Sequence, residues 1–285
     1  MLRTRHILCY TALLMMGALC CPTFLSAQSA SFINPAGTTI ETRFTLPEGY
    51  KRVPVQKNSY AYFLRRLPML PYDAVSNNSP PESQHVGALN LYPMNNMLKE
   101  IQLCVRLRGE YFFRREQYDK IGFSIVNFQR VFYREFVEGL MMTIGDKSYS
   151  TKQRLGVERY SSFNGYLGFV FINSDINTTL LDVQSVFIND IMPGDMFIQS
   201  GSSGGAVIVL DVAYNPSTGD RIFLLAKNHK PARVAYVLVN PKERWSGSPW
   251  YKVKTEGDKI VTPEFVFYKH DLRRFQDMMV TTAQK

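Results

Sequence analysis

Short apolar runs rich in β-branched residues are concentrated in the second half of the chain. Turns of glycine, proline, asparagine and aspartate separate four of them: DMFIQS (195–200), AVIVLDVAY (206–214), RIFLLAK (221–227) and RVAYVLVN (233–240). This pattern predicts an antiparallel sheet. Because the preceding half has apolar positions at helical spacing, we expect an α+β fold with N-terminal helices packed on a C-terminal antiparallel sheet.

The helical half contains several separate segments. Ser59 predicts the start of a short helix that Pro68 ends. The clearest amphipathic helix follows Asn95 or Asn96 in MLKEIQLCVRLRGEYFF (97–113), and Cys104 lies at the edge of its apolar stripe. Further on, KIGFSIVNF (120–128) predicts a strand. Helices are expected in QRVFYREFVEGLMM (129–142), in SSFNGYLGFVFIN (161–173) and from Asn177 or Thr178.

The N-terminus has the layout of a secretory signal. Arg3 and Arg5 precede an apolar run that ends in the small residues of FLSAQ. We expect residues 1–27 to be a signal peptide and residues 28–285 to form a single α+β domain with an extended arm over about 28–58. The apolar run is short for a bilayer span. The expected product is therefore an exported protein, periplasmic or extracellular, without a transmembrane segment.

Removal of the signal changes the cysteine and charge balance. Cys9, Cys20 and Cys21 would leave with it, and Cys104 would remain without a disulfide partner. The residues before Cys20 and Cys21 are not the small ones of a lipobox, so we expect no lipid anchor. The formal charge of +9 falls to +7 when two arginines leave. No nucleic-acid motif accompanies that excess.

The glycine-rich segment PGDMFIQSGSSGGAVIVLDVAY (193–214) allows several interpretations. A nucleophile elbow needs a helix after its serine, whereas a strand is predicted here. A chymotrypsin-like serine protease would use Ser203 as nucleophile and His85 as base. The block also resembles the core of papain-like cysteine peptidases of the NlpC/P60 type, in which a cysteine on an upstream helix would correspond to Cys104.

A second resemblance covers nearly all of the chain after residue 27. Successive blocks, among them RFTLPEGYKR, IQLCVRLRGEYFF, FLLAKNHKPA and VTPEFVFYKHDLRRF, are similar to an uncharacterised family of secreted Bacteroidetes proteins, domain of unknown function 4846. The family pattern has a histidine where this chain has Gly205 and a glutamine where it has Lys227. The resemblance therefore implies a papain-like site that has lost its base.

Without that base a cysteine needs a strongly depressed pKa to act as a nucleophile. Arg108, one helical turn after Cys104, favours a thiolate, and His229 is the one candidate for a replacement base. We expect a catalytically degenerate, non-enzymatic protein that binds a peptide or peptidoglycan-type fragment, with Arg108, Lys227, Asn228 and Trp250 as candidate binding residues. The alternative is an active cysteine hydrolase that uses Cys104 and His229.

Other chemistry has little support in the sequence. His85, His229 and His270 are far apart and show no metal-ligand spacing, so we expect neither a metal site nor another cofactor. Trp245 and Trp250, in RWSGSPWYK, are candidates for lining a groove for sugar or peptide, and core packing is the alternative for both.

Overall fold

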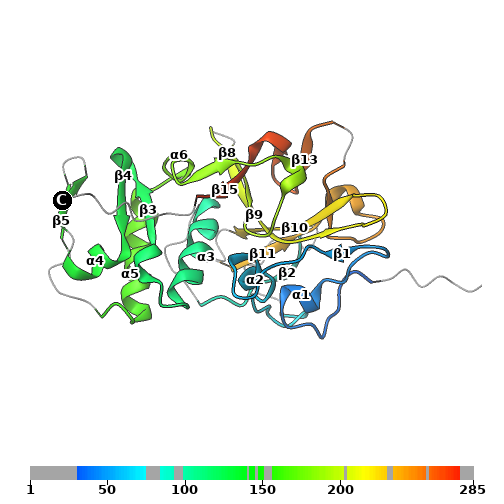
Figure 1. Ribbon diagram of the computed structural model, residues 1–285, viewed down its shortest axis with the longest axis horizontal. Helices are drawn as coiled ribbons and strands as arrows, with labels where there is room; N and C mark the ends of the chain where they lie inside the picture. Colours follow the sequence, from blue (N-terminus) through cyan, green and yellow to red (C-terminus); the bar gives the residue numbers. More distant parts are fainter. Residues whose placement is uncertain are drawn as a thin grey trace, which may run out of the picture.

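The computed structural model describes residues 31–74, 84–92, 99–139, 141–144, 147–150, 156–201, 204–229, 234–254 and 257–276. The predicted signal peptide and the predicted helix start at Asn95 or Asn96 lie outside these residues. The described molecule is elongated, with a large sheet toward one end and a mainly helical part toward the other (Figure 1).

Nine strands of the described chain form one antiparallel sheet in the order β2-β11-β10-β9-β8-β15-β7, with β1 paired to β9 and β12 to β10. They are β1 (Lys51–Arg52), β2 (His85–Ala88), β7 (Val183–Ser185), β8 (Met196–Gln199), β9 (Gly205–Tyr214), β10 (Arg221–His229), β11 (Val234–Leu238), β12 (Tyr251–Lys252) and β15 (Leu272–Phe275). Strands β8 to β11 are the four predicted from the sequence. The prediction of a large antiparallel sheet is therefore confirmed.

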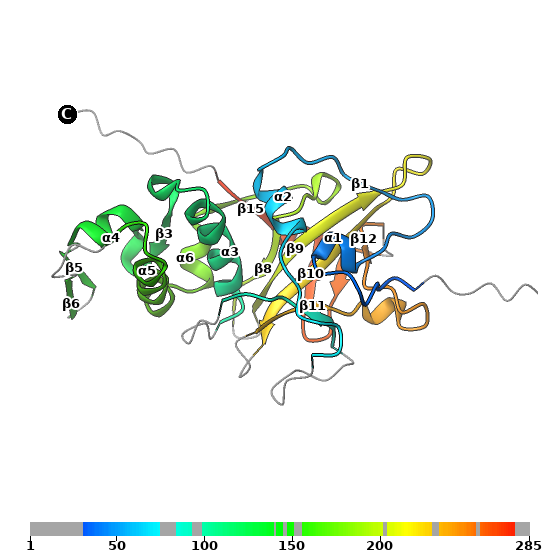
Figure 2. The ribbon, with the colours of Figure 1, turned by 90° about the horizontal axis from the view of Figure 1, so that it is seen from below.

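Helices cover one face of this sheet and also form the far end of the molecule. In Figure 2, α1 and α2 lie over β9 and β10, and α3 lies beside them. The helices are α1 (Ile40–Arg43), α2 (Tyr60–Arg65), α3 (Ile101–Phe113), α4 (Tyr133–Gly139), α5 (Tyr160–Asn173) and α6 (Ile176–Leu180), with 3₁₀ turns η1 (Tyr118–Lys120), η2 (Val126–Phe128), η3 (Ile188–Asp190), η4 (Pro241–Glu243) and η5 (Lys269–Asp271).

Three two-stranded hairpins complete the described fold: β3 (Gly122–Ile125) with β4 (Gln129–Phe132), β5 (Met141–Ile144) with β6 (Lys147–Ser150), and β13 (Lys259–Val261) with β14 (Val266–Tyr268). The predicted helix over residues 129–142 is therefore wrong at both ends, which belong to β4 and β5, and right for α4 between them. Asn127 and Phe128 turn the chain with backbone φ of 62° and 58°. Residues other than glycine seldom adopt this left-handed conformation, so helix propensity does not predict the turn.

The core of the sheet is divided between its two faces. Along β9, Ala206 and Ile208 belong to the apolar cluster on the helix side, whereas Val207 and Val209 belong to the cluster on the other side, with Phe267 of β14. Successive side chains of a strand point to opposite faces, which produces this alternation. Both faces are buried, and this explains why β9 has an almost continuous apolar sequence.

Helix α3 is buried on nearly all sides, in contrast to its predicted amphipathic character. It packs against the sheet and also contacts α5 and α6. Its buried residues therefore include the polar Gln102, Arg106 and Glu110. Arg106 and Glu110 form an ion pair at 3.4 Å, one helical turn apart. Pairing of this kind is what permits charged side chains in a packed interior.

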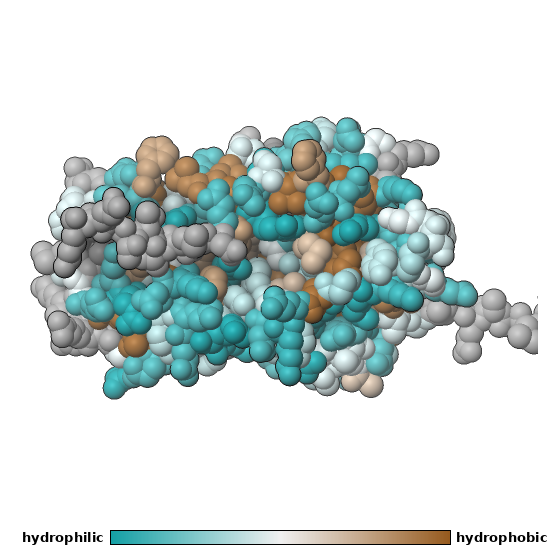
Figure 3. Space-filling view, in the orientation of Figure 1, coloured by the Kyte–Doolittle hydropathy of each residue, from teal (hydrophilic) through white to brown (hydrophobic). Residues whose placement is uncertain are grey.

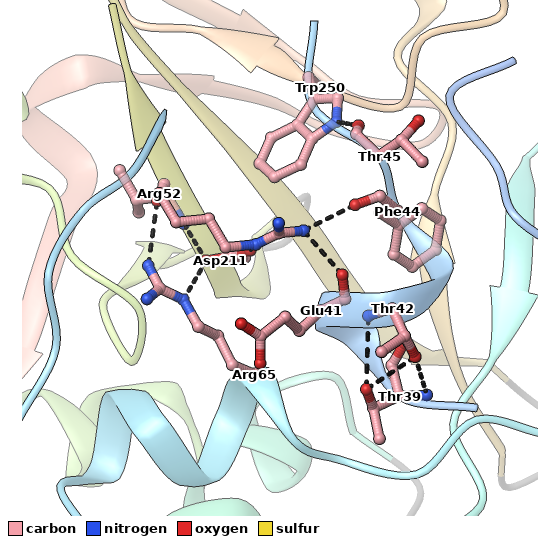
Figure 4. A network of polar contacts seen from close by, with 10 residues as sticks. Thr39, Glu41, Thr42, Phe44, Thr45, Arg52, Arg65, Asp211 and Trp250 are labelled. Carbon is pink, nitrogen blue, oxygen red and sulfur yellow. Dashed lines mark hydrogen bonds and ion pairs between the residues drawn. The ribbon is translucent and has the colours of Figure 1, made fainter. Parts of the chain in front are cut away.

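A buried carboxylate joins the N-terminal segments to the sheet (Figure 4). The sheet register shifts between Leu224 and Leu225, so β9 has an extra residue there and Asp211 points to the helix side. Asp211 is 0% exposed and accepts hydrogen bonds from Arg52 Nε at 2.7 Å and Arg65 Nε at 2.5 Å. Arg52 also donates to the carbonyl oxygens at both ends of α1. One acid thus holds α1, β1 and α2 on the sheet.

Candidate functional site

The predicted nucleophile lies inside the protein. Cys104 is on the first turn of α3, is 1% exposed and belongs to the apolar cluster on the helix side of the sheet. Burial raises the pKa of its thiol to about 12. Because the thiolate is the reactive form of cysteine, this position favours an inert side chain at neutral pH.

Arg108 lies one turn further along α3, as predicted, and it packs among aromatic rings. Its guanidinium carbon is 4.6 Å from the centre of the Phe112 ring and 5.0 Å from that of Tyr60. These are cation–π distances. Burial is the largest cause of the raised pKa of Cys104, so the arginine does not produce the depressed thiol pKa that the sequence suggested.

Gly205, the position of the expected histidine, faces away from this helix. A Cβ atom built on Gly205 would lie 2.6 Å from the ring of Phe265, which packs on the opposite face of the sheet from Cys104. A side chain at residue 205 would therefore point away from the thiol. The structure does not bring Cys104 and Gly205 together as a cysteine–histidine pair.

The predicted residues of β10 divide between the two faces. Lys227 is buried beside Phe265, with its Nζ 4.9 Å from the ring centre, and forms an ion pair with Glu264. His229 lies two residues on, hence on the same face, and contacts the ring of Tyr236. Burial lowers the pKa of this histidine. Lys227 and His229 are thus grouped with Gly205 and separated from Cys104.

Asn228 points the other way, toward the start of α3. Its Nδ2 donates to the carbonyl oxygen of Lys99 at 3.0 Å. Trp250, another predicted binding residue, is buried, and its Nε1 donates to the carbonyl oxygen of Thr45 at 2.8 Å (Figure 4). Of the two alternatives for Trp250, lining a groove or packing in the core, the structure therefore shows core packing. Both side chains hold separate parts of the chain together.

For the serine-protease alternative, Ser203 lies outside the described residues. The proposed base, His85, is in β2 at the edge of the sheet, where its ring centre is 4.6 Å from that of Tyr236. No group of three or more potential metal ligands occurs among the described residues. Within the same residues, no helix combines the length and apolar character needed to cross a membrane.

A cavity of about 560 Å³ lies near the edge of the sheet formed by β2 and β11, and sequence reasoning missed it. Three segments form it: the start of β2, the loop that follows β11, and the turn between β13 and β14. Its lining includes Gln84, Val86, Asn240, Arg244, Thr262 and Pro263. Pockets of this size that combine apolar walls with a few polar groups are typical ligand sites.

Polar groups of the cavity are partly committed to the fold. Asn240 donates to the carbonyl oxygen of Trp250 at 2.7 Å and so fixes the loop that forms one wall. Gln84 contributes a buried Oε1 that has no hydrogen-bond partner among the described residues. A buried acceptor without a partner costs free energy that a donating ligand group would recover.

Trp245 lies in the loop that contributes Arg244 and Gly247 to the cavity wall, and its side chain is 100% exposed. Figure 3 shows a surface that is mostly hydrophilic on the face it presents, with hydrophobic residues in separate patches. A large aromatic side chain left entirely in water beside a cavity is a candidate contact for a ligand. The segment RWSGSPWYK was the sequence signal for this site.

Comparisons with known proteins give one match. The family model described as "Domain of unknown function (4846)" matches residues 40–274. No curated protein and no solved structure matches the chain.

Proposed function

Because the chain belongs to the family of domain of unknown function 4846, which has no assigned reaction, we propose a function from the geometry. The protein is an exported, non-catalytic binding protein for cell-wall glycan fragments. The cavity between β2, the loop after β11 and the β13–β14 turn is the proposed binding site. A papain-like origin of the fold stays a prediction. In either case the proposed site differs from the groove expected around Cys104.

The environment of Cys104 supports the non-catalytic part of the proposal. A thiol with a pKa of about 12 is almost entirely protonated at neutral pH. Gly205, the position of the expected histidine, and His229, the candidate replacement base, lie on the other face of the sheet from Cys104. Nucleophilic catalysis requires the nucleophile and its base within hydrogen-bond reach.

The observation that carries the binding part is the cavity of about 560 Å³, one wall of which is a loop that also bears the fully exposed Trp245. The indole of Trp245 offers a flat apolar face, which suits the C–H face of a sugar ring. The Gln84 side chain, on the cavity wall, offers an amide that can bond a ligand hydroxyl once its inaccessible Oε1 turns toward the cavity. A cell-wall glycan supplies both features, because its sugars carry apolar ring faces and hydroxyl groups.

Cosedimentation with insoluble peptidoglycan tests this proposal. We expect the protein without residues 1–27 to pellet with peptidoglycan and Trp245→Ala to lose most of that binding. Phe187→Ala is the matched control, because Phe187 is 84% exposed and follows β7, at the opposite edge of the sheet from β2.

The same samples test for catalysis. We expect chromatography of the soluble fraction to show no released fragments with the original chain or with Cys104→Ser. Failure of the original chain to pellet would contradict the binding proposal. Cleavage that disappears in Cys104→Ser would contradict the non-catalytic assignment and favour the hydrolase alternative.

A further inference from the structure

A second cavity adjoins the proposed glycan site. It has a volume of about 260 Å³ and shares Asn240, Glu243 and Val261 with the first. The two cavities are therefore neighbours, which we call together the depression, and the second is lined by four lysines: Lys242, Lys252, Lys254 and Lys259. Lys252, Lys254 and Lys259 are close in sequence, and the loop after β11 adds Lys242.

Two of the four lysines have carboxylate partners. Lys252 forms an ion pair with Glu243, and Lys254 forms one with Asp220 at 2.5 Å. Lys242 and Lys259 form no ion pair within the described part of the chain, and both are exposed. They present two uncompensated ammonium groups at the second cavity.

The charge balance of the whole depression is strongly positive. With Arg244 from the first cavity, the described lining has five basic residues, against two acids that pair with them, Glu243 in the lining and Asp220 beside it. A concave surface lined by one sign of charge concentrates ligands of the opposite sign. The depression therefore selects for an anionic ligand.

We infer that the glycan fragment bound at this site is an acidic one, whose stem-peptide carboxylates lie at the second cavity against Lys242 and Lys259 while a sugar ring contacts Trp245. This inference rests on the proposed function and adds the charge class of the ligand. The exposed indole favours a saccharide that carries acidic peptides over an acidic peptide alone, which would need only the lysines.

The test uses peptidoglycan before and after its carboxylates are converted to neutral amides with a carbodiimide and ammonia. We expect the original chain to bind the amidated material about tenfold more weakly, the combined effect of two exposed ion pairs of ordinary strength. The variant Lys242→Gln/Lys259→Gln should bind untreated peptidoglycan about tenfold more weakly and be insensitive to amidation.

The control variant is Lys120→Gln/Lys147→Gln, which removes the same charge from exposed positions in η1 and β6; β6 lies at the opposite end of the molecule from β12 (Figure 2). It should bind like the original chain. Equal binding of amidated and untreated peptidoglycan would overturn the inference and leave the proposed function standing, whereas binding of neither would overturn both. Lysine-dependent binding of polyglutamate without binding of peptidoglycan would assign the depression to an acidic peptide instead.

Discussion

Replacing Asp211 by asparagine tests whether one carboxylate holds the N-terminal segments on the sheet. The substitution keeps the shape of the side chain and removes its charge. Arg52 and Arg65 would then both face an uncharged partner, although their side chains are only 20% and 7% exposed. Their remaining hydrogen bonds are to backbone carbonyl oxygens.

The expected loss follows from burial. Removing one partner of a buried ion pair costs about 3–5 kcal/mol, because the other charge stays desolvated without compensation. Asp211 is fully buried and serves two arginines at 2.5 and 2.7 Å, so we expect a loss in that range. Single domains are typically stable by about 5–15 kcal/mol, and the variant would therefore be marginal.

Urea unfolding measures the change in the free energy of unfolding. The matched control is Asp119→Asn, which removes the acid of the exposed Arg134–Asp119 pair. That pair has side chains 44% and 62% exposed, so its loss should cost at most about 1 kcal/mol. Adding Arg65→Met to Asp211→Asn should cost less than the sum of the two single changes, because both act on one network.

A result in which Asp211→Asn and Asp119→Asn cost the same would refute this reasoning. It would mean that Asp211 is replaceable by any polar group of its shape. The hydrogen bond from the backbone of Val212 to Asp211 at 2.9 Å would then be the contact that matters.

Two further variants test the geometry around the predicted catalytic positions. Gly205→Ala should destabilise the protein by about 1–3 kcal/mol because its Cβ would overlap the Phe265 ring, and Phe265→Leu should recover part of that loss in thermal denaturation. Gly165→Ala, in the exposed middle of α5 with open space around it, should instead stabilise by up to about 1 kcal/mol; equal effects of the two alanines would contradict the packing argument. Cys104, with its pKa of about 12, should resist a thiol reagent from pH 7 to 9 in the native protein and react fully in denaturant. Labelling of the native protein below pH 7 would show that Cys104 is not buried.

The sheet was predictable from the sequence because its central strands are buried on both faces. Such strands appear as short, continuous apolar runs between turn residues, and β8 to β11 follow that pattern. The position of helix α3 was also predicted, but its burial on nearly all sides was not. Arg106 and Glu110 are charged, so a helical wheel places them toward solvent, whereas the structure buries them as a pair.

The candidate site was not predictable in the same way. Its walls come from residues 84–86, 239–248 and 261–263, which no local pattern connects. The predicted Cys104–Gly205 site failed to assemble for a related reason. Sequence order can place a helix beside a strand, but the alternation of side chains along β9 decides which face residue 205 presents, and a single-residue change of register reverses it.

The Asp211 network also has a consequence for the order in which the chain folds. Arg52 and Arg65 precede their acid by 159 and 146 residues, so α1, β1 and α2 lack their anchor until β9 has been synthesised. Contacts of such long sequence separation slow folding, because a large loop must close before they form. The N-terminal segments therefore leave the ribosome well before the strand that anchors them has been made.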